Sequence, residues 1–226
     1  MHTLTTTPVV PYPMQEWNDY ARLFASITTS MQLEVYREAC KHLSGHVIDC
    51  GCGSAKIAPL LVDETTVKSY TGVDYAEEMV GVARWVIQNL QNPHFAIRHN
   101  KIEDVNDQQF TSAVSIQSYY AWPDPVAVLR HIFQLLTPNA VFVLATPNTQ
   151  LGLADLARDA WKELLAHPDF EAYKTYNLKL ANNPHANFIS MNDLVQQVQS
   201  VGFRVQECHQ RHFRGGLNFL VLSKEC

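Results

Sequence analysis

The chain has 226 residues, of which 46% are hydrophobic and 17% are charged, and its formal net charge at pH 7 is −5. This composition predicts a folded globular chain, and its cations do not form the clustered runs that a nucleic-acid-binding surface needs. No segment approaches the roughly 20 apolar residues of a membrane-spanning helix, so we expect neither nucleic acid nor a membrane as a partner.

The first part of the chain, about 15 residues rich in threonine and proline, predicts a flexible arm. It has no basic flank and no apolar core, so it does not resemble a secretory signal peptide. The chain has five cysteines, and Cys50 and Cys52 are too close together for a CxxC redox or zinc motif. We therefore expect reduced thiols and a cytoplasmic location.

Apolar and aromatic residues recur at three- and four-residue spacing over residues 14–42, which predicts helical structure before the first strand. A compact apolar run over residues 46–50 then predicts a buried strand. This strand ends in a tight glycine-containing turn at residues 51–53, and a helical pattern follows over residues 55–62.

Strands and helices alternate over the next part of the chain. The expected strands cover residues 67–74, 94–98, 112–117 and 141–145, and the expected helices cover residues 77–90 and 125–136, with a turn at 137–139. Such alternation implies right-handed crossovers and a parallel sheet with helices on both faces. The spacing leaves the order of the strands open.

The rhythm changes between residues 147 and 190. Helical patterns at residues 154–166 and 170–180 predict an insertion over the active edge of the sheet.

The alternation resumes with a helix at residues 192–200, for which Ser190 is a suitable N-cap. The last two strands, at residues 203–208 and 217–223, are joined by a short connection. We expect them to be antiparallel, because parallel neighbours need a longer crossover.

Two features at the ends of the first two strands indicate a ligand site. Gly51 and Gly53 allow the backbone to approach a ligand closely, and the next helix presents unpaired N–H groups. Asp74 ends the second strand, where an acidic side chain can accept hydrogen bonds from both hydroxyls of a ribose. Taken singly, the glycines could form a plain turn and Asp74 could cap a helix. Together they favour a nucleoside ligand.

Residues 47–53 and 72–79 resemble the first two motifs of the class I S-adenosylmethionine-dependent methyltransferases. Residues 135–140 and 200–203 resemble the turns before the fifth and sixth strands of that family. The resemblance implies an α/β fold: a Rossmann-like seven-stranded methyltransferase sheet with helices on both faces, an N-terminal helical cap and a helical insertion before strand six. It also implies S-adenosyl-L-methionine as the cofactor.

The same resemblance implies roles at the methionine and ribose ends of the cofactor. Asp49 would orient the glycine turn and approach the methionine amino group, while Gly51 and Gly53 would line the methionine and ribose portions. Asp74 would hold the ribose hydroxyls. The sequence departs from the family at Ala55, which stands at the usual third glycine and is a small change for the turn.

At the adenine end the resemblance places Tyr75 on the ring face, and Met79 either near the ring or in the helix core. Many family members have an acidic residue after the third strand, near the adenine amino group. Here Lys101 stands at that position. The backbone of Ile102 could still bond to the ring, and Asn100 could replace the acidic side chain.

The segment after the fourth strand borders both the sulfonium and the acceptor in this family. By position, Gln117 would face the methionine moiety, and Tyr119, Tyr120 or Trp122 would face the acceptor or pack in the core. The Asn/Asp-Pro-Pro-aromatic signature of many base and amide N-methyltransferases is absent from this segment. This absence disfavours nucleobase and glutamine-amide acceptors.

Catalysis requires a base only when the acceptor starts protonated, and histidine is the usual candidate at neutral pH. We expect His185 and Tyr120 to be the catalytic residues. His167, His209 and His212 also fall near the expected acceptor side, with a solvated or packed role as the alternative for each. No complete ligand set surrounds the last two, so we predict no metal.

Trp17, Tyr20 and Phe24 share one face of the N-terminal helical pattern. This face would either dock on the core or form a lid over the cofactor, with Tyr20 as a cofactor-side residue. The aromatic residues of the insertion that could join them around an apolar acceptor are Trp161, Tyr173, Tyr176 and Phe188.

We therefore expect a single domain over residues 1–226 that moves the methyl group of S-adenosylmethionine to an oxygen, nitrogen or sulfur atom of a small organic molecule, aromatic or apolar. Its expected parts are an arm and cap (1–43), a cofactor-binding core (44–146), a helical insertion (147–190) and a final helix with two strands (191–226). The alternatives are a non-catalytic module that binds the cofactor and an NAD(P)-dependent oxidoreductase. The sequence leaves the acceptor and the oligomeric state open.

Overall fold

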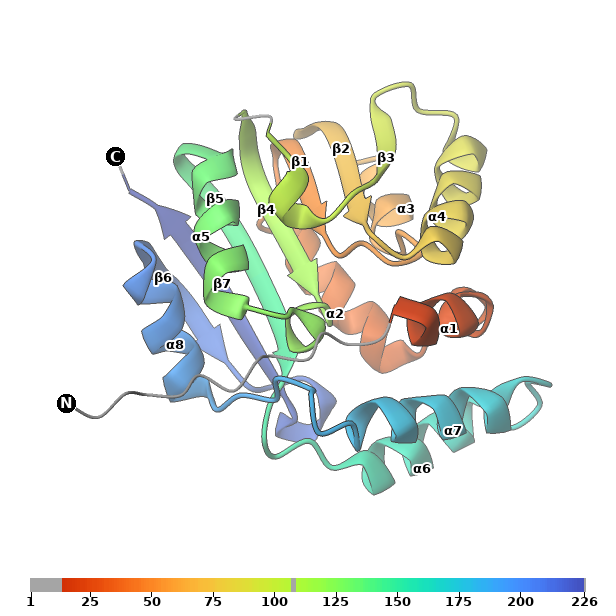
Figure 1. Cartoon of the computed structure of the whole chain (residues 1–226). Helices are drawn as coiled ribbons and strands as arrows, with labels where there is room; N and C mark the ends of the chain where they lie inside the picture. Colours follow the sequence, from red (N-terminus) through yellow and green to blue (C-terminus); the bar gives the residue numbers. More distant parts are fainter. Residues whose placement is uncertain (1–13, 107–108, 226) are drawn as a thin grey trace.

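The structure, a computed structural model, describes residues 14–106 and 109–225 (Figure 1). Its strands are β1 (Gly45–Cys50), β2 (Val67–Asp74), β3 (Phe95–His99), β4 (Phe110–Ile116), β5 (Leu136–Pro147), β6 (Phe203–His209) and β7 (Leu217–Lys224). Its α-helices are α1 (Met14–Ser26), α2 (Ser30–Cys40), α3 (Ala58–Leu61), α4 (Glu77–Leu90), α5 (Pro125–Leu135), α6 (Leu153–Leu164), α7 (Phe170–Ala181) and α8 (Met191–Ser200). Its short 3₁₀ segments are η1 (Ile102–Asp104), η2 (Tyr119–Ala121) and η3 (Phe213–Gly215).

The strands of the described residues form one seven-stranded sheet in the order β3-β2-β1-β4-β5-β7-β6. Strands β1 to β5 are parallel, and β7 is antiparallel to both of its neighbours, β5 and β6. The predicted seven-stranded α/β sheet and its antiparallel final pair are therefore confirmed. The strand order reverses between β1 and β4, and such a switch point opens a crevice at the carboxyl ends of the strands.

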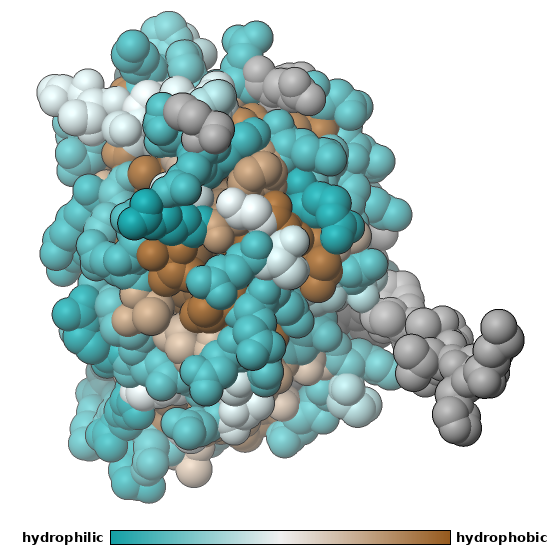
Figure 2. Space-filling view, turned by 90° about the vertical axis from the view of Figure 1, so that its left-hand side faces the viewer, coloured by the Kyte–Doolittle hydropathy of each residue, from teal (hydrophilic) through white to brown (hydrophobic). Residues whose placement is uncertain are grey.

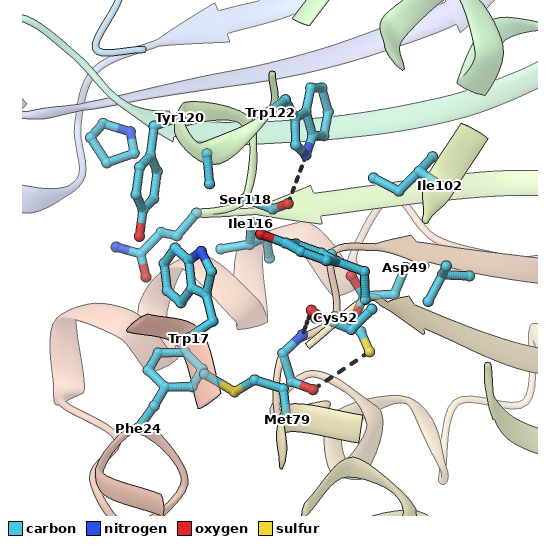
Figure 3. Close-up of a pocket in the computed structure, with 18 of the residues that line it drawn as sticks. Trp17, Phe24, Asp49, Cys52, Met79, Ile102, Ile116, Ser118, Tyr120 and Trp122 are labelled. Atoms are coloured by element: carbon cyan, nitrogen blue, oxygen red, sulfur yellow. Dashed lines mark hydrogen bonds between the residues drawn. The ribbon is translucent and has the colours of Figure 1, made fainter. Parts of the chain in front are cut away.

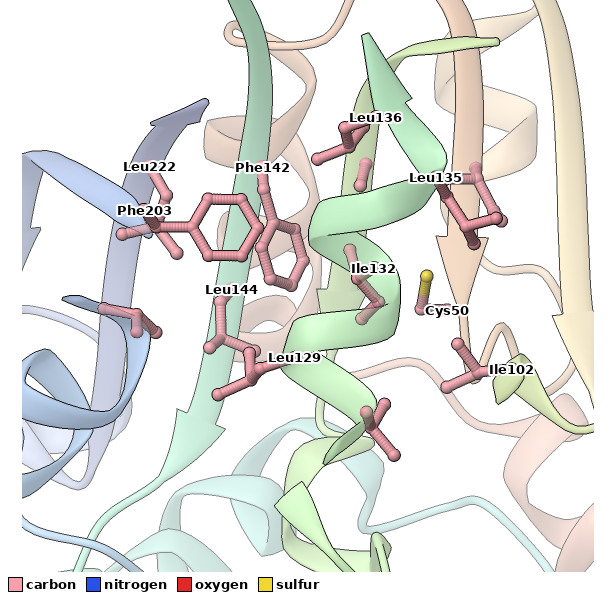
Figure 4. Close-up of a cluster of buried hydrophobic side chains, with 14 of the residues drawn as sticks. Cys50, Ile102, Leu129, Ile132, Leu135, Leu136, Phe142, Leu144, Phe203 and Leu222 are labelled. Carbon is pink, nitrogen blue, oxygen red and sulfur yellow. The ribbon is translucent and has the colours of Figure 1, made fainter. Parts of the chain in front are cut away.

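Helices cover both faces of the sheet, as the alternation predicted. On one face α5 and α8 pack against the strands in an apolar cluster that includes Leu129 and Phe142 (Figure 4). On the other face α2, α3 and α4 pack through Val35, Leu61 and Ala83. Each large apolar side chain buried in this way contributes roughly 1.5–3 kcal/mol, so the sheet is a firm support for the residues at its edge.

The helical cap and the insertion gather at the carboxyl ends of the parallel strands. Figure 1 shows α1, α6 and α7 at the end of the sheet towards which the arrows of β1 and β4 point. Helix α1 packs against α4 and α7 through a third apolar cluster, to which Tyr20, Met79 and Tyr173 belong. The insertion therefore lies over the edge where the sequence predicted the site.

The helical pattern predicted over residues 14–42 forms two helices, α1 and α2. The helix is interrupted between Ser26 and Ser30, and Thr29 is the N-cap of α2. The Thr29 hydroxyl accepts a hydrogen bond from the Gln32 N–H at 3.2 Å, and the Gln32 side chain accepts one from the Thr29 N–H at 3.0 Å. This reciprocal capping box starts a new helix in a new direction.

Two expectations need correction. The helix predicted at residues 55–62 is reduced to α3, because Ala55 has a left-handed backbone (φ +57°) that cannot belong to an α-helix. The turn predicted at residues 137–139 lies within β5, where Leu136 already pairs with Phe110. The register of the β4–β5 pairing shifts in this part of the strands, and Asn139 has a left-handed backbone (φ +63°).

Figure 2 views the molecule from the side that lies at the left of Figure 1, and it shows mostly hydrophilic residues with apolar side chains exposed in a limited area near the middle. Among the described residues, no helix has the length and apolar character that a membrane crossing requires. The predicted flexible arm falls largely on residues 1–13, which lie outside the described residues.

Candidate active site

A cavity of about 450 Å³ lies where the carboxyl ends of β1, β2 and β4 meet, beneath α1 (Figure 3). This volume is within the range of roughly 300–1,000 Å³ that small-molecule and cofactor sites occupy. The sequence-predicted residues that line it are Tyr20, Asp49, Gly51, Gly53, Asp74, Tyr75, Met79, Lys101, Ile102, Gln117 and Tyr120. The structure thus brings together all the cofactor candidates and one of the two catalytic candidates.

The glycine turn after β1 needs its glycines. Gly51 and Gly53 have left-handed backbones, with φ +76° and +52°. A Cβ on Gly51 would lie 1.9 Å from the Ser118 hydroxyl oxygen, closer than atoms can approach. The N–H groups of Gly51 and Cys52 both donate to the carbonyl of Val73, at 2.9 and 3.0 Å, so the turn is held against β2.

The carboxylate of Asp74 ties the ends of β1 and β2 together. Its Oδ2 accepts a hydrogen bond from the Gly53 N–H at 2.8 Å, and its Oδ1 accepts one from the Ala76 N–H at 2.9 Å. Burial raises the pKa of Asp74, while these N–H groups act in the opposite direction. The backbone N–H of Tyr75 also bonds to this carboxylate, and the acceptor capacity that remains can bind a hydroxyl of a diol in the cavity.

Asp49 is a buried acid on the cavity wall, with 5% of its surface exposed. Burial raises its pKa to about 7, against the opposing effect of the Tyr70 hydroxyl, which donates a 2.7 Å hydrogen bond to Oδ2. The negative charge of Asp74 raises this pKa further. A cationic group that enters the cavity would favour the charged form of Asp49.

Asn100, Lys101 and Ile102 follow β3 and also line the cavity. Ile102 begins η1 and is buried, with 7% of its surface exposed. Tyr75 also lines this part of the site, and its carbonyl is held by the His99 ring at 3.0 Å.

The segment after β4 forms a wall between the cavity and the core. Gln117 has a left-handed backbone (φ +57°), and its N–H donates to the carbonyl of Ala145 at 2.7 Å. Trp122 lines the cavity and donates from its indole N–H to the Ser118 hydroxyl at 2.8 Å (Figure 3). Tyr119, in contrast, is buried in the core and donates to Gln197 at 2.6 Å, so the structure removes it from the acceptor candidates.

Aromatic rings from three parts of the chain surround the outer part of the cavity. The Tyr120 ring lies 6.0 Å from the Trp17 ring of α1 and 5.9 Å from the Phe188 ring, which follows the insertion helices (Figure 3 shows the first pair). The backbone of Asn187 also bonds to the carbonyl of Tyr120 at 2.8 Å. The insertion is therefore fixed to η2 at this point.

The N-terminal cap both docks on other helices and faces the cavity. Tyr20 stacks on Tyr176 of α7 at 4.7 Å, and its hydroxyl accepts from the Asn177 amide at 2.9 Å. Trp17 and Phe24 of the same helix line the cavity. Docking against the rest of the protein and covering the cavity, the two alternatives for this helix, are therefore compatible. Of the other insertion aromatics, Trp161 is 45% exposed, and Tyr173 lines a smaller neighbouring cavity.

No histidine of the described residues lines the cavity. His185 is exposed on the loop after α7, and its N–H bonds to the Asn183 side chain at 2.9 Å. The structure does not bring this residue together with the other candidates. His167 lies between α6 and α7, where its ring accepts from the Asp169 N–H at 3.2 Å.

His209 and His212 lie beside a carboxylate that the sequence did not associate with them. Both rings contact Glu38 of α2, at 3.1 and 2.5 Å, and their ligand atoms form a potential three-ligand metal cluster. The guanidinium of Arg211 also donates to Glu38 at 2.7 Å. In the structure the carboxylate is thus the centre of an ion-pair cluster that joins α2 to the β6–β7 connection.

Lys56 is a site residue that the sequence analysis did not single out. Its ammonium donates to the Ile27 carbonyl at 2.5 Å and lies 3.7 Å from the centre of the Phe24 ring. Its position directly after the glycine turn was the available signal, but the direction of the side chain depends on how α1 packs over that turn. Cys52 and Ser118 also line the cavity, and the sequence analysis did not single them out as site residues either.

The model of a family described as "Methyltransferase domain" matches residues 14–208. An O-methyltransferase from Pyrenophora dematioidea is 27% identical over 80% of this chain, and a trans-aconitate 2-methyltransferase from Enterobacter sp. (strain 638) is 29% identical over 60% of it. The chain spans 62% and 52% of the lengths of these two relatives. A solved structure of mycolic acid cyclopropane synthase CmaA1, complexed with SAH and CTAB, superposes with a TM-score of 0.69 at 15% identity and covers 95% of this chain and 99% of that one.

Proposed function

Since the chain belongs to the class I S-adenosylmethionine-dependent methyltransferases, with S-adenosylmethionine as its cofactor, we propose that it transfers the cofactor's methyl group to an oxygen atom of a small, largely apolar organic molecule. The observation that carries the proposal is the cavity at the β1/β4 switch point, which places two carboxylates and the glycine turn beside an aromatic chamber.

The cavity residues fit the cofactor chemically. Gly51 and Gly53 line the cavity without side chains, so a ligand can lie directly against the backbone of the turn. Asp49 would hold the methionine amino group, Asp74 would hold the ribose hydroxyls, and Tyr75 would pack against the adenine beside the backbone of Ile102. Lys101 cannot accept a hydrogen bond from the adenine amino group, so we assign recognition there to backbone and apolar contacts.

The outer chamber supports a neutral acceptor. Trp17, Phe24, Tyr120 and Phe188 present aromatic surface there, and the cations that line the whole cavity in the described residues are two lysines, Lys56 and Lys101. No arginine of the described residues lines the cavity, and we assign Lys56 to the cofactor, so a free carboxylate on the acceptor would have no bidentate partner there. An oxygen acceptor is supported by the printed activity of the Pyrenophora relative, and a phenolic or alcoholic hydroxyl on an apolar skeleton fits the chamber best.

The bound cofactor supplies a methyl group on a positively charged sulfur, which is already activated for in-line displacement. The protein therefore acts mainly by positioning the acceptor and excluding water. Trp17 and Phe188 would hold the acceptor on two sides, and the Tyr120 hydroxyl would donate a hydrogen bond to the acceptor oxygen. The acceptor would react as its oxyanion, after the hydroxyl proton has passed to solvent water. Because His185 is exposed and absent from the cavity wall, we assign it no role in this step.

The test is methyl transfer from isotopically labelled S-adenosylmethionine to a matched panel: a phenol, a carboxylic acid, an amine and a thiol on the same apolar skeleton. We expect labelled methyl ether from the phenol, with one S-adenosylhomocysteine released for each methyl group. Transfer to the amine or thiol alone would overturn oxygen as the acceptor atom. Cofactor binding without turnover on any acceptor would favour the non-catalytic module. With S-adenosylmethionine as the cofactor, the oxidoreductase alternative is not retained.

A further inference from the structure

Lys56 is a cation that faces the cofactor cavity from the segment after the glycine turn. Its side chain lies under the cap, where the ammonium bonds to the carbonyl of Ile27 and sits over the ring of Phe24. Both contacts come from the end of α1 and its connection to α2. The lysine thus joins the cofactor-binding turn to the cap.

This ammonium has no carboxylate partner among the residues that the structure describes. A carbonyl and a ring face stabilise a buried cation only in part, because neither carries a full negative charge. Burial accordingly lowers the pKa of Lys56 to about 7. An anion that enters the cavity beside it would stabilise the charged form strongly.

We propose that Lys56 pairs with the carboxylate of the cofactor's methionine moiety. This inference rests on the cofactor assignment and goes beyond it by naming the residue that recognises the charged end of the cofactor. The carboxylate is the one anionic group of S-adenosylmethionine, and Lys56 is the cation on the glycine-turn side of the cavity. Lys101, the other lysine of the wall, follows β3, which β2 separates from β1 and its glycine turn.

In this arrangement, each of the two charged groups of the methionine moiety would meet a side chain of opposite charge. Asp49 is a carboxylic acid suited to the amino group, and Lys56 is an amine suited to the carboxylate. The Lys56 ammonium also donates a hydrogen bond to the Ile27 carbonyl and lies over the Phe24 ring. Its charged form therefore connects the end of α1 to the glycine turn. Cofactor binding would thereby order the cap that carries the acceptor chamber.

The experiment measures binding by titration calorimetry with three ligands: S-adenosylhomocysteine, its decarboxylated analogue, which keeps the amino group, and 5′-methylthioadenosine, which lacks both groups. The variants are Lys56→Met, Lys56→Arg and, as a matched control, Lys68→Met at an exposed position on β2. We expect the Lys56→Met variant to lose at least tenfold in affinity for S-adenosylhomocysteine and less than twofold for the other two ligands. Lys56→Arg should recover part of the loss, and Lys68→Met should bind like the wild type.

If Lys56→Met loses affinity equally for all three ligands, Lys56 has a purely structural role and the proposal is overturned. An unchanged affinity of this variant for S-adenosylhomocysteine would also overturn it. If the Met variant does not fold, the wild type still decides: equal affinity for S-adenosylhomocysteine and its decarboxylated analogue would overturn the proposal. Binding of S-adenosylhomocysteine that does not depend on Lys56 leaves the proposed function intact. Failure of the folded wild type to bind it at all overturns the proposed function and this inference together.

Discussion

The carboxylate of Asp74 accepts a hydrogen bond of 2.8 Å from the backbone N–H of Gly53, which lies 21 residues earlier in the chain. This bond joins the turn after β1 to the turn after β2, and the second carboxylate oxygen accepts from Ala76 at the start of α4. One side chain therefore shapes the backbone of the site and also presents its remaining lone pairs to the cavity.

We expect Asp74→Asn to weaken S-adenosylhomocysteine binding by roughly 10- to 100-fold, because charged hydrogen bonds of this kind are worth about 1.5–3 kcal/mol. An amide keeps one acceptor oxygen but turns a donor towards one of the two N–H groups. Titration calorimetry gives the affinity, and thermal unfolding controls for folding. An affinity within twofold of the wild type would contradict the assignment of Asp74 to the ribose.

Gly51→Ala should destabilise the protein by about 1–3 kcal/mol and abolish cofactor binding. The new Cβ would meet the Ser118 hydroxyl at 1.9 Å, and alanine disfavours φ +76°. The matched control is Gly81→Ala in α4, where a Cβ meets nothing within 4 Å. That change should stabilise the protein by roughly 0.5–1 kcal/mol, because alanine is the better helix former. Chemical unfolding measures both values.

Asp49→Asn should stabilise the protein at neutral and alkaline pH while weakening cofactor binding. Burial raises the pKa of Asp49 to about 7 in the folded protein, above its ordinary value of 3.8. The folded state therefore holds the proton more tightly than the unfolded state, and stability falls as pH rises from about 4 to about 7. Asparagine cannot ionise, so the advantage of the variant should grow across this window to roughly 2–4 kcal/mol and then level off.

Chemical unfolding of both proteins at several pH values between 4 and 8.5 checks this expectation, since the difference between the two curves isolates Asp49 from other titrating groups. A difference that is constant with pH would show that folding does not shift the pKa of Asp49, which would contradict this prediction.

Trp17→Ala should raise the KM for an aromatic acceptor by about 2- to 10-fold, because Trp17 lines the cavity and an aromatic pair between its ring and the acceptor would be worth roughly 0.5–1.5 kcal/mol beyond its buried area. Affinity for S-adenosylhomocysteine should change by less than twofold. Steady-state kinetics with the best acceptor of the panel measures the first value. The control is Trp85→Ala on α4, a tryptophan that is 65% exposed and outside the cavity wall; an equal effect there would exclude a specific role for Trp17.

The sequence by itself determined the elements whose signals are local. The bounds of β2 and α4 match the predicted ranges, 67–74 and 77–90, because apolar periodicity and flanking turn residues act within a few positions. It also placed Asp49, Asp74 and the glycine turn at strand ends. Since parallel strands end at one edge of a sheet, these residues had to meet once the strands paired.

Only the tertiary structure decided which side chains complete the site. The order of strands, the neighbours of Lys56 and the exposure of His185 depend on contacts between segments far apart in the chain. Glu38 lies about 170 residues before the histidines that surround it, so no local pattern could associate them. Side-chain direction is set by the packing of one element on another, and that packing is a property of the folded chain as a whole.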